Sequence, residues 1–148
     1  MLDARELRTE RDSHASYIIN DVKLPHRKNL ENDLEWIARS LGLIGARDKE
    51  KSAMKIFKVL VRSAGDGTNL RSDGISNDVH LSRGTVVSHL NHMMACGLTV
   101  RRDNRYELRV RSMERTVDEI EKDICRVLRN IKEIARDADE YLDLRYRE

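Results

Sequence analysis

The stretch LSRGTVVSHLNHMMACGLTVRRDNRYELR, residues 81–109, decides the fold. Its first half predicts a helix of about 82–95, because Ser82 is a good N-cap and apolar residues recur on one face. That apolar face consists of Val86, Leu90, Met93 and Met94. Gly97 stands where the residue that ends a helix in the left-handed conformation is expected. We therefore expect the helix to stop before the second half, whose pattern is different.

Two short extended runs, 98–102 and 106–110, make up that second half. The polar turn Asp103-Asn104-Arg105 separates them. Apolar and charged residues alternate along the second run, which is typical of a half-exposed strand. We therefore expect a two-stranded ribbon with a basic tip formed by Arg101, Arg102 and Arg105.

Helical periodicity predicts most of the chain before residue 81. Apolar residues at spacings of three and four predict one helix over 26–41 and another over 49–64. Residues 74–79 are interpreted as a short helix that packing must hold, because Gly, Ser, Asn and Asp form helices poorly. We also expect helical structure within residues 1–20.

The last segment, 112–148, predicts one long amphipathic helix, because no Gly or Pro interrupts it. The residues of its apolar stripe that we assign to a homodimer interface are Val117, Ile120, Ile124, Val127, Ile131, Ile134 and Tyr141. The chain has too little material to cover so long a stripe, so we expect a second copy to cover it. Packing against the chain's own N-terminal helices is the alternative, and the sequence does not decide between parallel and antiparallel pairing.

Composition and charge narrow the class of protein. The chain has 148 residues, of which 36% are charged and 4% aromatic, and this helix-rich composition argues against a β-sandwich or a barrel. The formal charge is +2, but the segments 1–48, 49–111 and 112–148 carry −1, +6 and −3, so the positive charge lies in the middle. From the sequence we expect no membrane span, no signal peptide and no disulfide framework. We therefore expect a cytoplasmic protein without a bound cofactor.

The predicted order of helix, short helix, turn, helix and ribbon is that of a winged helix-turn-helix domain. We expect a mainly α fold with a small β-wing, divided into an N-terminal helical extension (1–47), a winged helix-turn-helix domain (48–111) and a C-terminal coiled-coil-like dimerisation helix (112–148). In such a domain the helix after the turn enters the major groove of double-stranded DNA, and the wing contacts the backbone or minor groove. The residues that we assign to DNA contact are Arg83, Thr85, Ser88, His89, Asn91, His92, Arg101, Arg102 and Arg105.

The same stretch resembles the ArsR/MarR-type winged-helix transcription regulators. The shared pattern consists of Ser82, Thr85-Val86, His89-Leu90, Gly97-Leu98, Tyr106 and Leu108. The long C-terminal helix is similar to that of archaeal regulators of this type. The resemblance covers about residues 54–145 and implies a DNA-binding, repressor-like function. Such proteins often have glycine in the turn before this pattern, whereas this chain has His80, a residue type that tolerates positive φ.

Three other interpretations are weighed on the sequence alone. A winged helix can serve as a protein-interaction module without binding DNA. His89, His92 and Cys96 share one helix face and are competent metal ligands, so a metal-responsive sensor is a further alternative. No fourth ligand lies near them in sequence, and we expect no metal site. No catalytic motif is present, and we expect the protein not to be an enzyme.

Overall fold

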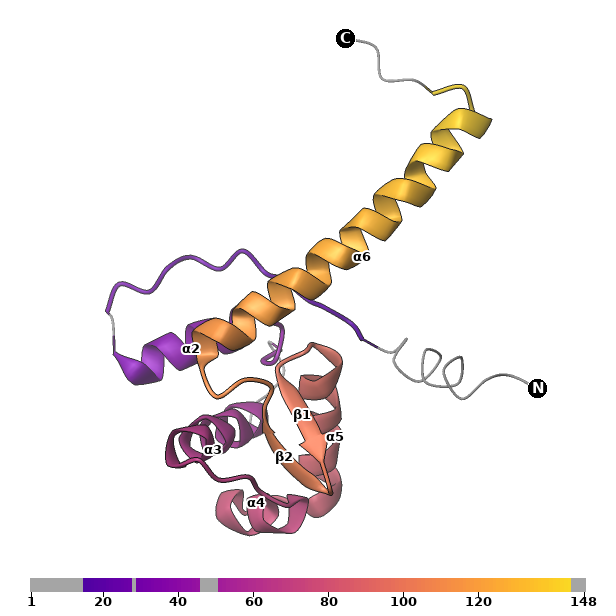
Figure 1. Ribbon diagram of the computed structural model, residues 1–148. Helices are drawn as coiled ribbons and strands as arrows, with labels where there is room; N and C mark the ends of the chain where they lie inside the picture. Colours follow the sequence, from indigo (N-terminus) through magenta and orange to yellow (C-terminus); the bar gives the residue numbers. More distant parts are fainter. Residues whose placement is uncertain (1–14, 28, 46–50, 145–148) are drawn as a thin grey trace, which may run out of the picture.

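The computed structural model describes residues 15–27, 29–45 and 51–144 (Figure 1). Its helices and strands are α2 (Leu30–Ser40), α3 (Ser52–Asp66), α4 (Ser72–Val79), α5 (Arg83–Ala95), β1 (Thr99–Arg102), β2 (Arg105–Leu108) and α6 (Met113–Tyr141). This confirms the prediction of a mainly helical fold with a small two-stranded sheet and a long C-terminal helix. In Figure 1, α3, α4, α5 and the hairpin form one body, and α6 runs out of it as a rod.

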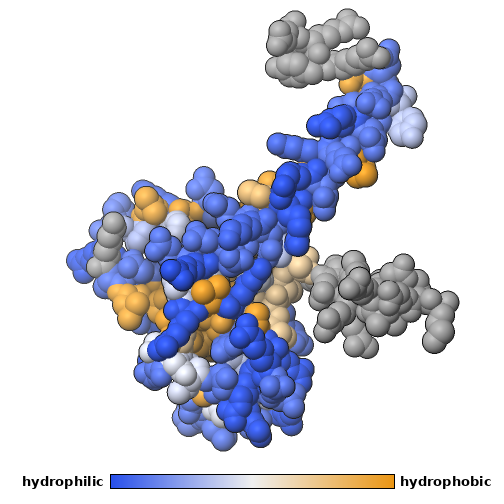
Figure 2. All heavy atoms as spheres, viewed as in Figure 1, coloured by the Kyte–Doolittle hydropathy of each residue, from blue (hydrophilic) through white to orange (hydrophobic). Residues whose placement is uncertain are grey.

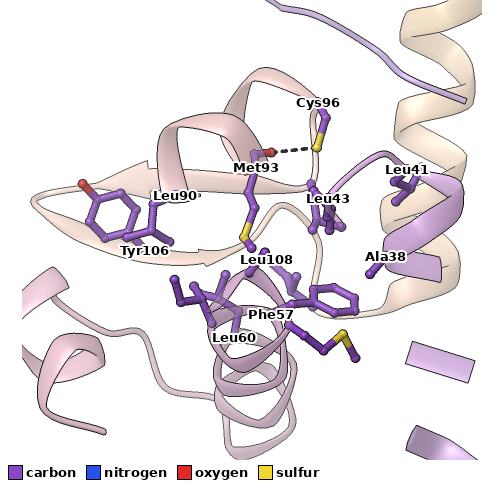
Figure 3. Packing of buried hydrophobic residues seen from close by; sticks show 14 of the residues in the cluster. Ala38, Leu41, Leu43, Phe57, Leu60, Leu90, Met93, Cys96, Tyr106 and Leu108 are labelled. Atoms are coloured by element: carbon purple, nitrogen blue, oxygen red, sulfur yellow. Dashed lines mark hydrogen bonds between the residues drawn. The ribbon is translucent and has the colours of Figure 1, made fainter. Parts of the chain in front are cut away.

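The core lies where α3, α5 and the β1–β2 hairpin meet. Phe57 and Leu60 of α3 are fully buried, and Figure 3 shows them next to Met93 of α5. Ala38 and Leu41 close one side of the same cluster and bring α2 against α3. The apolar faces that predicted these helices are therefore the faces that the core buries.

Both ends of α5 follow the sequence prediction. Ser82 is the N-cap, and its hydroxyl oxygen accepts a hydrogen bond from the backbone N–H of Thr85 at 3.2 Å. At the other end, Cys96 is the C-cap and Gly97 follows with a φ of +82°. A left-handed residue at this point turns the chain out of the helix and into β1.

The junction between α4 and α5 is a tight turn centred on His80. His80 has a φ of +55°, in the left-handed region that glycine usually occupies. The hydroxyl of Ser76 donates to the carbonyl of Leu81 at 2.5 Å, and the N–H of Leu81 donates to the carbonyl of Ser76 at 3.3 Å. These bonds close the turn, so the histidine is accommodated as its positive-φ tolerance allowed.

The hairpin turn has one residue fewer than the predicted turn Asp103-Asn104-Arg105. Arg102 pairs with Arg105, so only Asp103 and Asn104 form the loop. Both loop residues have positive φ, +50° and +64°, which is the type I′ geometry that suits the twist of a two-residue hairpin. Arg105 therefore belongs to the strand, and the strands end at Leu108 instead of residue 110.

One residue between α3 and α4 pairs with β2, as a third strand would. Leu70 forms an isolated antiparallel bridge with Tyr106. The N–H of Tyr106 donates to the carbonyl of Leu70 at 2.7 Å, and the return bond is 3.1 Å long. The bridge ties the start of α4 to the outer edge of the hairpin.

The prediction of helix within residues 1–20 is wrong for residues 15–20, and its remainder lies outside the described residues. This segment is extended, because its backbone donors bond to distant elements. The N–H of Ser16 donates to Ala95 at 2.8 Å, and that of Asn20 donates to Ser40 at 2.8 Å. The indole N–H of Trp36 points at the carbonyls of Val22 and Lys23, at 3.2 and 3.1 Å.

Helix boundaries elsewhere differ from prediction by a few residues. α2 begins at Leu30 instead of residue 26, because Asn29 caps it by accepting from the N–H of Asn32 at 2.8 Å. α4 begins two residues earlier than expected, at Ser72. α6 ends at Tyr141 and does not continue through residue 144, since Asp143 has a φ of +52°. The prediction for 145–148, like that for 49–50, lies outside the described residues.

The long helix α6 has two halves that differ in burial. Thr116 and Ile120 are buried against the body of the protein, and Ile124 is partly buried there. Beyond Arg126, every described residue of the helix is exposed. The apolar stripe therefore divides into a part that belongs to the chain's own core and a part that the described residues leave uncovered.

Candidate nucleic-acid interface

The N-terminal half of α5, the start of α4 and the hairpin turn lie at one end of the molecule. They occupy the lower end of the view in Figure 1, and Figure 2 shows predominantly hydrophilic residues over that end. The opposite side of each element is in the core, because Val86 and Leu90 of α5 and Tyr106 of β2 are buried. Burial of one face thus fixes which side chains point outward.

The outward face of α5 is centred on small and amide side chains. Gly84, Ser88 and Asn91 are exposed, and Arg83 is exposed beside them. Thr85 and His89 are only half exposed, and the Ser82 hydroxyl donates to the Thr85 hydroxyl at 2.8 Å. The first turn of α5 contains no acidic residue, so nothing offsets the partial positive charge of the helix N-terminus.

The tip of the hairpin holds three exposed arginines. Arg101 donates to the side chain of Asn104 across the turn, and its guanidinium lies 5.9 Å from the ring centroid of Tyr106. Arg105 donates to the side-chain oxygen of Asn69 at 3.4 Å. Arg102 faces Glu107, with 3.3 Å between nitrogen and oxygen. Two of the three charges are thus held in place without being neutralised by a carboxylate.

A hollow of about 400 Å³ separates α5 from the hairpin tip. Its lining residues are Arg71, Ser72, Asp73, Arg83, Val87, Arg101, Asn104 and Tyr106. Three guanidinium groups, from α5, the hairpin and the residue before α4, therefore surround one concavity that holds a single carboxylate. The geometry suits a polyanion that approaches all three elements at once.

Two arginines of the basic segment bond to other parts of the chain. Arg111, although exposed, donates to the carbonyls of Ala64 and Gly65 at 2.8 and 3.2 Å, at the C-terminal end of α3. Arg109 donates to Asp123 of α6 at 2.5 Å. Neither arginine lines the hollow between α5 and the hairpin tip.

Asp123 is the centre of a polar cluster behind the hairpin. It accepts from Arg109 and, at 2.9 Å, from the hydroxyl of Tyr17. The Arg109 hydrogen bond is the main cause that holds the pKa of Asp123 below its ordinary value. Burial raises the pKa of Tyr17, and its bond to Asp123 raises it further. The cluster joins the N-terminal segment, the hairpin and α6 in one place.

His92 and Cys96 do not converge on one point with His89. The Nε2 atom of His92 lies 3.1 Å from the carbonyl oxygen of Gly42, on the side of α2. The thiol of Cys96 is buried, donates to the carbonyl of Met93 at 3.2 Å, and has a pKa raised by burial. Within the described ranges, no group of three His, Cys, Asp or Glu side chains is arranged to hold a metal ion.

No protein-family model, curated protein or solved structure matches this chain. Among the helices of the described ranges, none is long and apolar enough to cross a membrane.

The structure brings most of the assigned DNA-contact residues to one end. Arg83, Ser88 and the hairpin arginines share the end described above. Asn91 is exposed farther along α5, and His92 lies in the last turn of α5 against Gly42. Three residues at that end were not singled out from sequence: Arg71, Gly84 and Asn104. A β-carbon added at Gly84 would meet nothing within 4 Å, so this position presents bare backbone to the outside. Asn often adopts positive φ in two-residue hairpin turns, and this preference could have placed Asn104 at the hairpin tip from sequence.

Proposed function

We propose that this protein is a winged helix-turn-helix regulator of transcription that binds double-stranded DNA. The observation that carries the proposal is the hollow between α5 and the hairpin, with Arg71, Arg83 and Arg101 around it. In this proposal α4 and α5 are the helix-turn-helix, the β1–β2 hairpin is the wing, and the Leu70 bridge is a vestigial third strand.

The proposed contacts divide by chemistry. Ser88 and Asn91, at the exposed centre of α5, reach base edges in the major groove, because hydroxyl and amide groups can both donate and accept hydrogen bonds there. Arg71 and Arg105 contact DNA phosphates on either side of α5. Arg101, at the wing tip, contacts the DNA backbone or the minor groove. Gly84 allows the backbone of α5 to approach the duplex closely.

The proposed protein acts as a homodimer through α6, and repression follows from occupying a promoter. DNA-binding dimers of this kind recognise two half-sites on one face of the duplex. The exposed apolar part of α6 supports the dimer, because it offers the largest uncovered row of aliphatic side chains in the described part of the chain.

A titration of the full-length protein with duplex DNA tests the proposal. Affinity should fall steeply between about 50 and 200 mM salt, and each lost phosphate contact should reduce the slope of log K against log salt by about 0.9. We expect this reduction for Arg101→Ala and Arg105→Ala. Arg62→Ala is the matched control, because Arg62 is also an exposed arginine but lines a different hollow with Asp66 and Asp78.

The titration has two results that contradict the proposal. Absence of binding at the lowest salt would favour a protein-interaction module built on the same fold. An equal effect of Arg62→Ala and Arg101→Ala would show that DNA affinity depends on the total positive charge of the protein, and not on the arginines around the hollow.

A further inference from the structure

The C-terminal half of α6 carries a row of exposed large apolar side chains. Val127, Leu128, Ile131, Ile134, Tyr141 and Leu142 are between 38% and 90% exposed. Four of them, Ile131, Ile134, Tyr141 and Leu142, are more than half exposed. The described residues of the chain do not cover them, so the row requires a partner surface.

The size of this row fits a second copy of the same helix. Six side chains that each expose roughly 100 Å² offer on the order of 600 Å² per chain, or about 1,200 Å² in a symmetric pair. That total reaches the lower end of the range for specific protein interfaces. A helical extension of about fifteen residues without tertiary contacts is also marginal in water on its own, so pairing explains why it stays helical.

We infer that the two copies of α6 pair antiparallel, with Ile131 of one chain against Ile134 of the partner subunit. This register rests on the dimer of the proposed function but needs no DNA. It sets Val127 against Ala138 of the partner subunit, and Ile124 against the partner subunit's Tyr141. Ala138 then faces Val127 of the partner subunit, whereas parallel pairing would set Ala138 against its own copy and leave a gap in the seam.

Charge favours the same orientation. Residues 137–140 contain three acids and no base, whereas Arg126 and Arg129 precede Ile131. Parallel helices would bring the acidic stretch against its own copy. Antiparallel helices bring the acidic stretch of one chain to the same level along the axis as Arg126 and Arg129 of the partner subunit. The two acidic stretches are thereby separated along the rod.

The antiparallel register has a consequence for the DNA interfaces. The two α6 helices enter the pair from opposite ends, so their first residues are about 60 Å apart along the axis at 1.5 Å per residue. Each α4–α5–hairpin end then belongs to a separate end of the rod, and the rod determines how far apart the two half-sites can be.

A distance measurement tests the orientation directly. In a Cys125→Ser background, Asp118→Cys provides one exposed cysteine for a spin label, because Cys96 is buried. Antiparallel pairing predicts a label separation of about 45 Å, and parallel pairing about 10 Å plus the length of the labels. A short separation overturns the inference. A monomer at all concentrations also overturns it, together with the homodimer of the proposed function. DNA binding by such a monomer would leave the proposed DNA contacts standing.

Discussion

A single methyl group at Gly97 should destabilise the joint between three segments of the chain. It ends α5 with a φ of +82°, a conformation that residues with a side chain rarely adopt. A β-carbon there would lie 3.2 Å from the ring of Tyr17 and 3.3 Å from both the guanidinium of Arg109 and the side chain of Ile120. These three neighbours come from the N-terminal segment, the end of the hairpin and α6. Gly97→Ala therefore strains the backbone at residue 97 and also crowds these three side chains.

The expected cost of Gly97→Ala has two parts. The left-handed conformation costs an alanine about 1–2 kcal/mol. Crowding of a packed site costs about 1–3 kcal/mol, and the lower half of that range applies because Arg109 and Tyr17 can each shift slightly. We therefore expect a loss of about 2–4 kcal/mol in the free energy of unfolding.

Urea denaturation followed by circular dichroism measures this loss. The midpoint should fall while the slope m stays unchanged, because the variant alters stability without altering the surface exposed on unfolding. Adding Tyr17→Ala should remove part of the crowding, so the two changes together should cost less than the sum of each alone.

Gly74→Ala is the control. Gly74 lies within α4, and a β-carbon there would meet nothing within 4 Å, so alanine should stabilise by about 0.5–1 kcal/mol. A cost below about 0.5 kcal/mol for Gly97→Ala would refute the reasoning, since neither the strain nor the contacts would then be real.

Two further predictions concern polar side chains that bond to distant parts of the chain. Arg111→Ala should lower stability by about 1 kcal/mol, because the C-terminal carbonyls of α3 lose their donor, and should leave the salt dependence of DNA binding unchanged. Asp123→Asn should cost about 1–3 kcal/mol at neutral pH. Because the folded pKa of Asp123 is lowered, its contribution is complete above the unfolded value near 3.9 and is lost as pH falls through the folded pKa. The wild-type and Asn proteins should therefore converge in acid urea titrations, and a constant difference down to pH 2 would contradict the assignment.

Local patterns predicted most of the secondary structure. α5 depends on a cap, an apolar face and a terminal glycine that lie within sixteen residues of one another, so its limits follow from the sequence. The spacing of apolar residues predicted a start of α2 at residue 26, whereas Asn29 caps the helix and it begins at Leu30. The Asn29 side chain was a usable signal, since Asn is among the preferred N-caps.

Long-range contacts were not predictable from the same patterns. Arg111 is 46 residues from Gly65, and Tyr17 is 106 residues from Asp123, so nothing in their local sequence identifies these partners. Residues 15–20 were expected to be helical from composition, but their donors bond to Ala95 and Ser40. Tertiary hydrogen bonds thus override a weak local preference.

The passage from hairpin to α6 is made of short, reciprocal bonds. Thr116 Oγ1 donates to the carbonyl of Val110 at 3.0 Å and accepts from its N–H at 3.2 Å, and Asp123, about two turns further along α6, accepts from Arg109. These bonds fix the orientation of the hairpin relative to the first half of α6, so we expect the two elements to move as one rigid unit. A displacement of the C-terminal end of α6 would then displace the hairpin tip as well.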